Sequence, residues 1–455
     1  MTNGSVIARQ REGKKTGALR RAASAAAVLF LAAAPVLAQG PIALSFSDAV
    51  GLAIKQNLQS LLAAEKISEA KGDAMSLYSE LWPRITATAS QQNQTANLAG
   101  LGFEQPLTPG MPLIIGPYGV FDARLHLVQN LLDVKSIADF AQGRAEVRLA
   151  KLEHDLSRPA VAEEAAMAYI EALRSAQAVA AARSDLDLAQ SLYVLAQDEH
   201  QVGVAQGVDV ARAKTRVAQE KYHAAQADLD ARISIIDLER VLGLPMDSYL
   251  ILTDSLRDSE QTVVSTQTAI AEALQNRVEL AVAQEQLRVD DLAARSAEGA
   301  LLPTVSAEAN YGLSGTSPSK NVHETRAVGA FVSLPLFDGG IYGHIRAAVS
   351  REKESRLTLG DLKQEIEKEV RVAAAQVWAA QEQVRAADDS LDLAQKELDM
   401  ARDRFRSGVA DNLEVLSAQT SIEEARDDHV TALAFYNQAR VRLAVALGDM
   451  ETFKL

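Results

Sequence analysis

Leu186-Asp187-Leu188-Ala189-Gln190 occurs a second time in this chain as Leu391-Asp392-Leu393-Ala394-Gln395, at an offset of 205 residues. The same offset relates Asp133 to Asp338 and Gly243 to Gly448. Similarity of a chain to itself at a fixed offset is the signature of an internal structural repeat. The sequence therefore predicts two copies of one unit rather than several unrelated globular domains.

Nearer the N-terminus the offset becomes 220, which relates Leu81-Trp82-Pro83 to Leu301-Leu302-Pro303. The extra residues of the first copy must lie between Pro83 and Asp133, where residues 97–117 are rich in Gly, Pro and Leu and predict a long loop. We place the first copy at residues 39–243, a linker at 244–264, the second copy at 265–449 and a C-terminal tail at 450–455.

Each copy is expected to contain a helix, two strands, a very long helix, a turn and a final helix. Residues 134–202 and 341–407 are almost free of helix breakers. At ~1.5 Å per residue, a helix of that length extends roughly 100 Å. Pro159 is the exception, and we expect it to kink the first long helix or interrupt it briefly.

The last helix of the second copy carries a regular heptad pattern with many alanines. Alanine at seam positions lets helix backbones approach closely, as in antiparallel coiled coils, although the core of an ordinary helical bundle shows the same periodicity. The seam positions are Val415, Ala418, Ile422, Ala425, His429, Ala432, Tyr436, Ala439, Leu443 and Ala446.

Four short runs alternate apolar and polar residues, at 84–90, 121–127, 304–311 and 328–334. Alternation with a period of two is typical of barrel strands in a membrane and equally of a half-buried soluble sheet. Four strands cannot close a membrane barrel, and lipid does not tolerate open sheet edges. We therefore expect a mainly α chain with a small β part, whose strands join those of other chains; three copies supply twelve strands.

Residues 1–38 resemble a secretory signal peptide: basic residues precede an apolar stretch from Ala22 to Leu37, and small residues end at Ala38. A signal anchor that stays attached is the alternative. Without this segment, 40 basic and 59 acidic residues remain, a formal net charge of −19. An acidic exported chain is a poor nucleic-acid binder. The chain has no cysteine, so neither disulfides nor a lipid-modified N-terminal cysteine is expected.

The two helix-strand-strand-helix-helix copies, the Leu-x-Pro entries at Pro83 and Pro303, the Pro335–Gly340 run and the Gly-Val-Ala turns together resemble the TolC-like outer-membrane efflux protein family. The resemblance covers residues 45–449. It implies a homotrimer with a twelve-stranded β-barrel in the outer membrane and an α-helical tunnel in the periplasm. It also implies docking to a periplasmic adaptor (membrane fusion) protein that links the channel to an inner-membrane transporter, in efflux or type I secretion.

The resemblance assigns roles to residues at the two turns. It places adaptor docking at the periplasmic tip formed by Gly203, Val204 and Ala205 and by Gly408, Val409 and Ala410. A glycine at these positions is also explained as the left-handed residue that ends a helix.

The family narrows its tunnel with acidic residues beyond the second turn, and Glu414 falls on such a position. The next acid of the family corresponds here to Ser417, which leaves a looser gate or one that uses Asp411. Asp209 matches a residue that holds the closed tip through contacts between helices. Any of these acids could equally belong to a solvated helix face.

No motif in the sequence indicates catalysis, a cofactor or a metal site. A Gly-x-Ser-x-Gly elbow, a phosphate loop, a dinucleotide fingerprint and a zinc-binding histidine pair are all missing from the sequence. A periplasmic coiled-coil adaptor or an adhesin is the alternative to a channel. An adaptor is expected to carry one hairpin between lipoyl-like strands and an adhesin a C-terminal barrel anchor, and neither matches the doubled hairpins.

Overall fold

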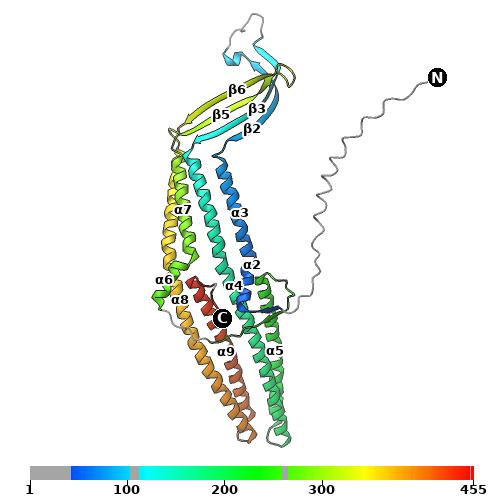
Figure 1. Cartoon of the computed structure of the whole chain (residues 1–455). Coiled ribbons are helices and arrows are strands. Elements are labelled where there is room, and N and C mark those ends of the chain that lie inside the picture. Colours follow the sequence, from blue (N-terminus) through cyan, green and yellow to red (C-terminus); the bar gives the residue numbers. More distant parts are fainter. Residues whose placement is uncertain (1–41, 103–111, 259–264, 451) are drawn as a thin grey trace, which may run out of the picture.

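The computed structural model describes residues 42–102, 112–258, 265–450 and 452–455. The predicted signal peptide, 1–38, lies outside the described residues, as do parts of the predicted loop and linker. The molecule is elongated, with a β-sheet at one end, two helical hairpin turns at the other, and short elements around the middle (Figure 1).

The two copies have helices of identical length. The first contains α2 (Phe46–Gln56), α3 (Leu58–Ser79), β2 (Arg84–Asn97), η1 (Ala99–Leu101), β3 (Ile114–Leu132), α4 (Val134–Gln201) and α5 (Gly207–Leu242). The second contains α6 (Thr266–Asn276), α7 (Val278–Gly299), β5 (Thr304–Gly315), β6 (His323–Ser333), α8 (Gly339–Arg406) and α9 (Asn412–Leu447). The lengths are 11, 22, 68 and 36 residues in both copies, which confirms the internal repeat.

Local signals explain where the long helices begin and end. Asp133 and Asp338 are N-caps whose carboxylates accept hydrogen bonds from the first turns of α4 and α8. The helix expected before the strands is in fact two, because Asn57 leaves the helical conformation and caps α3, accepting from the backbone N–H of Gln59 at 2.8 Å. In the second copy, Arg277 occupies the corresponding position and separates α6 from α7 in the same way.

We expected a kink or a brief interruption at Pro159, and the interruption is wrong, because α4 continues through this residue from Val134 to Gln201. The kink stays a prediction. A proline in a helix removes one backbone hydrogen bond. Immediately after it, Val161, Ala162, Ala165 and Ala166 are fully buried in the largest core cluster. We attribute the continuity to this packing, which fixes the helix directly after the proline.

The four long strands form one antiparallel sheet in the order β2-β3-β5-β6. All four strands are longer than the alternation predicted, although Leu334, expected in the fourth strand, lies just beyond the end of β6. The loop predicted at residues 97–117 is wrong at its end, because Ile114 and Ile115 belong to β3 and pair with Asn97 and Ala96 past a bulge. Residues 103–111 of that loop lie outside the described residues.

The register gives the sheet two chemically different faces. One row across the strands joins Ile85, Leu127, Ala309 and Val328, whereas the adjacent row joins Thr86, His126, Asn310 and Ala327. His126 Nδ1 lies within hydrogen-bond reach of Asn310 Oδ1, and Arg124 pairs with Asp122 on the polar face. In the described strands β2 and β6 each have one edge without a neighbour.

The main core lies midway along the molecule. There the parallel pair β1 (Ile42–Leu44) and β4 (Leu250–Leu252) and helix α2 pack against α4, α5 and α9. Tyr169 is fully buried and donates its hydroxyl to Leu44 O and Asp254 Oδ2, at 2.9 and 2.8 Å. Phe453 closes this core against Phe46, with ring centroids 5.6 Å apart. Within the described part of the chain, no helix combines the length and apolarity required to cross a bilayer.

Candidate functional site at the hairpin tips

The two hairpin turns lie side by side at the end of the molecule opposite the sheet (Figure 1). Gly203 and Gly408 have φ of 82° and 69°, so both take the left-handed conformation that favours glycine. In each turn the residue after the glycine donates to a carbonyl five residues earlier: Val204 N to Glu199 O at 2.9 Å and Val409 N to Arg404 O at 3.0 Å. These bonds form a Schellman motif, which satisfies the last carbonyls of α4 and α8.

The tips expose apolar side chains at the end of the molecule. Val204, Val409 and Leu413 are half or more exposed, at 50%, 69% and 60%. Ala205 and Ala410 are more covered, and Ala205 joins the core cluster between the hairpins. The turns therefore present exposed valines on a backbone that the capping bonds hold in place.

The three acidic residues singled out from the sequence lie near one another along the chain but have different surroundings. Asp209 is buried and accepts from the backbone N–H of Gln206 at 2.9 Å, closing a capping box on α5. Asp411 is the exposed N-cap of α9 and accepts from Leu413 N at 3.1 Å. Glu414 is exposed and pairs with Arg404 of α8 at 2.8 Å.

Contacts between the hairpins begin directly behind the tips. Asn412 is buried and its side-chain amide donates to Asp209 O at 3.2 Å, which joins α9 to α5. Further along, Arg216 of α5 pairs with Glu423 of α9, and Asp185 of α4 pairs with Arg426 of α9. Burial raises the pKa of Asp185, and the guanidinium of Arg426 opposes this shift.

Sequence reasoning missed Arg404, Asn412 and the ion pairs between the hairpins. Arg404 corresponds to Glu199 in the first copy, so the repeat offers no pair equivalent to Arg404–Glu414. Asp185 and Arg426 are 241 residues apart and occupy positions that the repeat does not relate to each other. A signal for these contacts would have required the relative placement of the two hairpins.

The described residues contain no group of three or more His, Cys, Asp or Glu side chains placed to hold a metal ion. The remaining histidines near the tips act locally: His200 Nδ1 lies 2.9 Å from Ala205 O, and His429 pairs with Asp388 at 2.9 Å. The geometry of the tip is thus that of two capped and ion-paired turns.

The sequence of this chain is similar to those of known proteins. The family model described as "Outer membrane efflux protein" matches residues 50–244 and 269–449, one segment in each copy. The alkaline protease secretion protein AprF of Pseudomonas aeruginosa is 24% identical over 350 residues, which are 73% of this chain and 71% of that protein. Protein CyaE of Bordetella pertussis is 28% identical over 62% of this chain, a match that spans 61% of its own length.

Solved structures agree on the fold. The CmeC outer membrane channel of Campylobacter jejuni has a TM-score of 0.77 at 17% identity, covering 90% of this chain and 87% of that one. The outer membrane protein VceC of Vibrio cholerae has a TM-score of 0.74 at 18% identity, covering 89% and 96%. Since the family model matches most of the chain, in both copies of the repeat, this chain belongs to the outer membrane efflux protein family.

Proposed function

We propose that this chain is one of three identical subunits of an outer-membrane exit duct in a tripartite efflux or type I secretion system. The observation that carries the proposal is the four-stranded sheet with unpaired edges at β2 and β6. An open sheet edge is incompatible with lipid. Edge-to-edge joining of three copies gives twelve strands with no free edge.

The two faces of the sheet support this assignment. The row with Ile85, Leu127 and Val328 provides an apolar surface for lipid, whereas the row with Thr86, His126 and Asn310 provides a polar surface for an aqueous lumen. Alternation of this kind is what a water-filled membrane barrel requires. With the sheet in the outer membrane, the helices extend into the periplasm, and the cleaved leader accounts for export.

At the periplasmic end, we assign adaptor docking to the turns Gly203-Val204-Ala205 and Gly408-Val409-Ala410. Their exposed valines offer apolar contact, and an adaptor in turn connects to an inner-membrane transporter. Glu414 and Asp411, both exposed at the start of α9, are the proposed constriction. Asp209 supports it indirectly, because its carboxylate fixes the start of α5 and its carbonyl binds Asn412.

A duct requires no catalytic residues, cofactor or metal, and we propose no enzymatic activity. Energy for transport comes from the inner-membrane partner, and gating from movement of the tip helices. Two classes of cargo fit the relatives: AprF is named for protease secretion, and the relative OpmQ of Pseudomonas putida is named for pyoverdine export. The polar face of the sheet suits small polar molecules and unfolded protein alike.

The test is the native mass and heat-modifiability of the protein extracted from outer membranes in mild detergent. We expect a membrane-bound species with the mass of about three mature chains that migrates differently before and after boiling. A soluble species with the mass of one chain contradicts the proposal and favours a periplasmic coiled-coil protein.

A further inference from the structure

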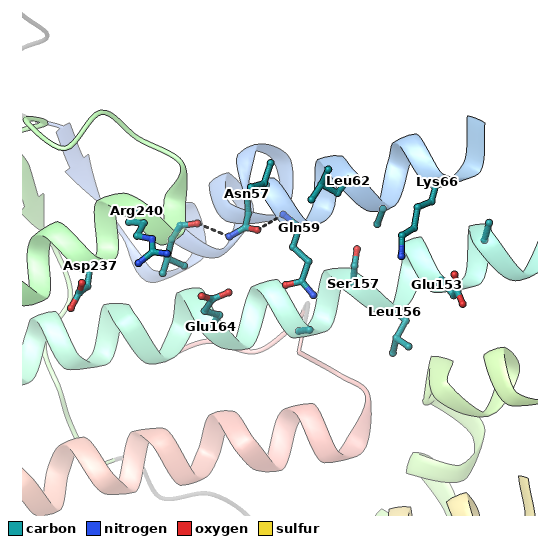
Figure 2. Close-up of a pocket in the computed structure, with 15 residues that line it drawn as sticks. Asn57, Gln59, Leu62, Lys66, Glu153, Leu156, Ser157, Glu164, Asp237 and Arg240 are labelled. Atoms are coloured by element: carbon teal, nitrogen blue, oxygen red, sulfur yellow. Dashed lines mark hydrogen bonds between the residues drawn. The ribbon is translucent and has the colours of Figure 1, made fainter. Parts of the chain in front are cut away.

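A cavity of about 1110 Å³ opens at the junction of α3, α4 and α5 (Figure 2). Its lining combines apolar side chains of α3, including Leu58 and Leu62, with charged ones. In Figure 2, Glu164 of α4 lies between α4 and Asn57, while Asp237 and Arg240 border the cavity from α5. Leu58 and Leu62 are 68% and 55% exposed, so the cavity is an open groove on this chain.

The internal repeat provides a second version of this groove for comparison. A smaller cavity of about 460 Å³ lies at the junction of α7, α8 and α9. The repeat offsets carry several lining residues of the first cavity onto lining residues of the second, among them Asn57 onto Arg277, Gln59 onto Glu279, Glu164 onto Glu369, and Asp237 onto Arg442.

The second cavity is smaller because side chains and a further helix of the same chain line it. The side chain of Arg277 is only 8% exposed and pairs with Glu279, at 2.7 Å, and with Glu369. Helix α4 of the first copy forms the opposite wall with Pro159, Ala160 and Glu163. Burial raises the pKa of Glu163, and the positive charge of Arg442 opposes this shift, which agrees with their positions on facing walls.

The first cavity has no equivalent wall among its lining residues. Asn57 replaces the arginine and donates its amide to Val241 O at 2.9 Å. Among the described residues, Glu164, Asp237 and Arg240 form no ion pair. At the second cavity, α4 packs across the junction of α7 and α9. No described helix takes the corresponding place across the junction of α3 and α5.

The order of the helices identifies that wall. Helix α4 packs against α3 and α5 on one flank and against α7 and α9 on the other. Helix α8, its repeat counterpart, packs against α7 and α9 on one flank and exposes apolar side chains such as Leu357 and Trp378, at 74% and 67%. If a second copy of the chain continues the packing that relates the two repeats, α8 of one chain lies against the α3–α5 junction of the next.

We propose that α8 of a second copy of the chain closes the first cavity, with Lys368 of the partner subunit against Asp237 and Glu365 of the partner subunit against Arg240. This inference rests on the proposed trimer. The residues follow from the repeat: Glu163 corresponds to Lys368 and Arg442 to Asp237, so the charges reverse and remain complementary.

A second pair obeys the same correspondence. Ala160 and Val445, which line the second cavity, correspond to Glu365 and Arg240. In the separate chain Lys368 pairs with Glu365 at 2.8 Å, with both side chains well exposed. An exposed ion pair of this kind contributes little to stability, so its exchange for partners in the neighbouring copy costs little.

Because the chain has no cysteine, paired cysteines can test this contact directly. The variant Asp237→Cys with Lys368→Cys is treated in outer membranes with a short bismaleimide and analysed after boiling in detergent. We expect covalent species of two and three chains. The matched control, Glu163→Cys with Arg442→Cys, occupies the corresponding positions within one chain and is expected to cross-link without any increase in chain number.

A charge exchange provides the second measurement. Asp237→Lys alone should lose most of the trimer that survives mild detergent, and adding Lys368→Asp should restore it. A trimer of normal native mass without interchain cross-links, or without rescue, overturns this contact and leaves the proposed duct intact. A native mass of one chain for the unmodified protein overturns both.

Discussion

The two helical hairpins have the same lengths but very different burial. In the second, α9 lies between α8 and α4, and Ile422, Tyr436 and Asn437 are fully buried. In the first, α5 packs mainly against α4 and α2 among the described elements and meets α9 through a few polar side chains such as Arg216. Tyr222, Leu229 and Ile233 of α5 are 68%, 50% and 48% exposed. Equal elements with unequal burial indicate that the first hairpin obtains its remaining contacts from outside the chain.

The largest expected effect comes from truncating the seam of the buried hairpin. Ile422→Ala removes a fully buried side chain and should lower the free energy of unfolding by about 2–5 kcal/mol. Its repeat counterpart Val217 is only partly buried, so Val217→Ala should cost about 1 kcal/mol. Thermal loss of the helical circular dichroism signal in detergent measures both; equal costs would contradict the difference between the hairpins.

Gly203, in the turn between α4 and α5, and Gly243, at the C-terminal end of α5, should differ in how well they tolerate a side chain. Both Gly243 and Gly203 have positive φ, so alanine costs about 1 kcal/mol of backbone energy at either position. At Gly243 a Cβ atom would also lie 2.9 Å from Gln56 O, whereas at Gly203 nothing lies within 4 Å. Gly243→Ala should therefore lower the melting temperature more; the reverse order would show that the tip is the more constrained end.

The pH dependence of stability tests the partly buried carboxylate at the second cavity. Burial raises the pKa of Glu163, so the folded chain holds this proton more tightly than the unfolded chain. Stability from this group is present below the unfolded pKa and is lost as pH rises through the folded value. Glu163→Gln should remove that part of the decline in melting temperature between roughly pH 4 and 7. Glu164→Gln, which removes the neighbouring exposed carboxylate at the first cavity, is the matched control.

The smallest effect on stability is expected at the tip. Glu414→Gln removes an exposed ion pair with Arg404 and should change the free energy of unfolding by less than ~1 kcal/mol. If Glu414 faces the lumen, single-channel conductance in planar bilayers should nevertheless change. Ser417→Ala, one turn further along the same exposed helix face, is the neutral control; identical conductance in all three proteins would remove Glu414 from the constriction.

The repeat was sufficient to predict the long helices to within two residues, because Asp133, Asp338 and the glycines after each helix are local signals. The division between α2 and α3 depends on the single residue Asn57, which periodicity does not reveal. The strand ends were missed because pairing past a bulge extends β3 into a stretch with loop composition. Contacts such as Asp185–Arg426 join the two copies in three dimensions, and no pattern within either copy encodes them.

The unequal strands have a consequence for the surface that faces the cell exterior. β2 and β3 contain 14 and 19 residues, whereas β5 and β6 contain 12 and 11. Around the mouth of a three-subunit duct, tall and short hairpins must therefore alternate. In the proposed trimer the mouth is therefore three-pointed, although the helices below repeat almost six times around the same axis.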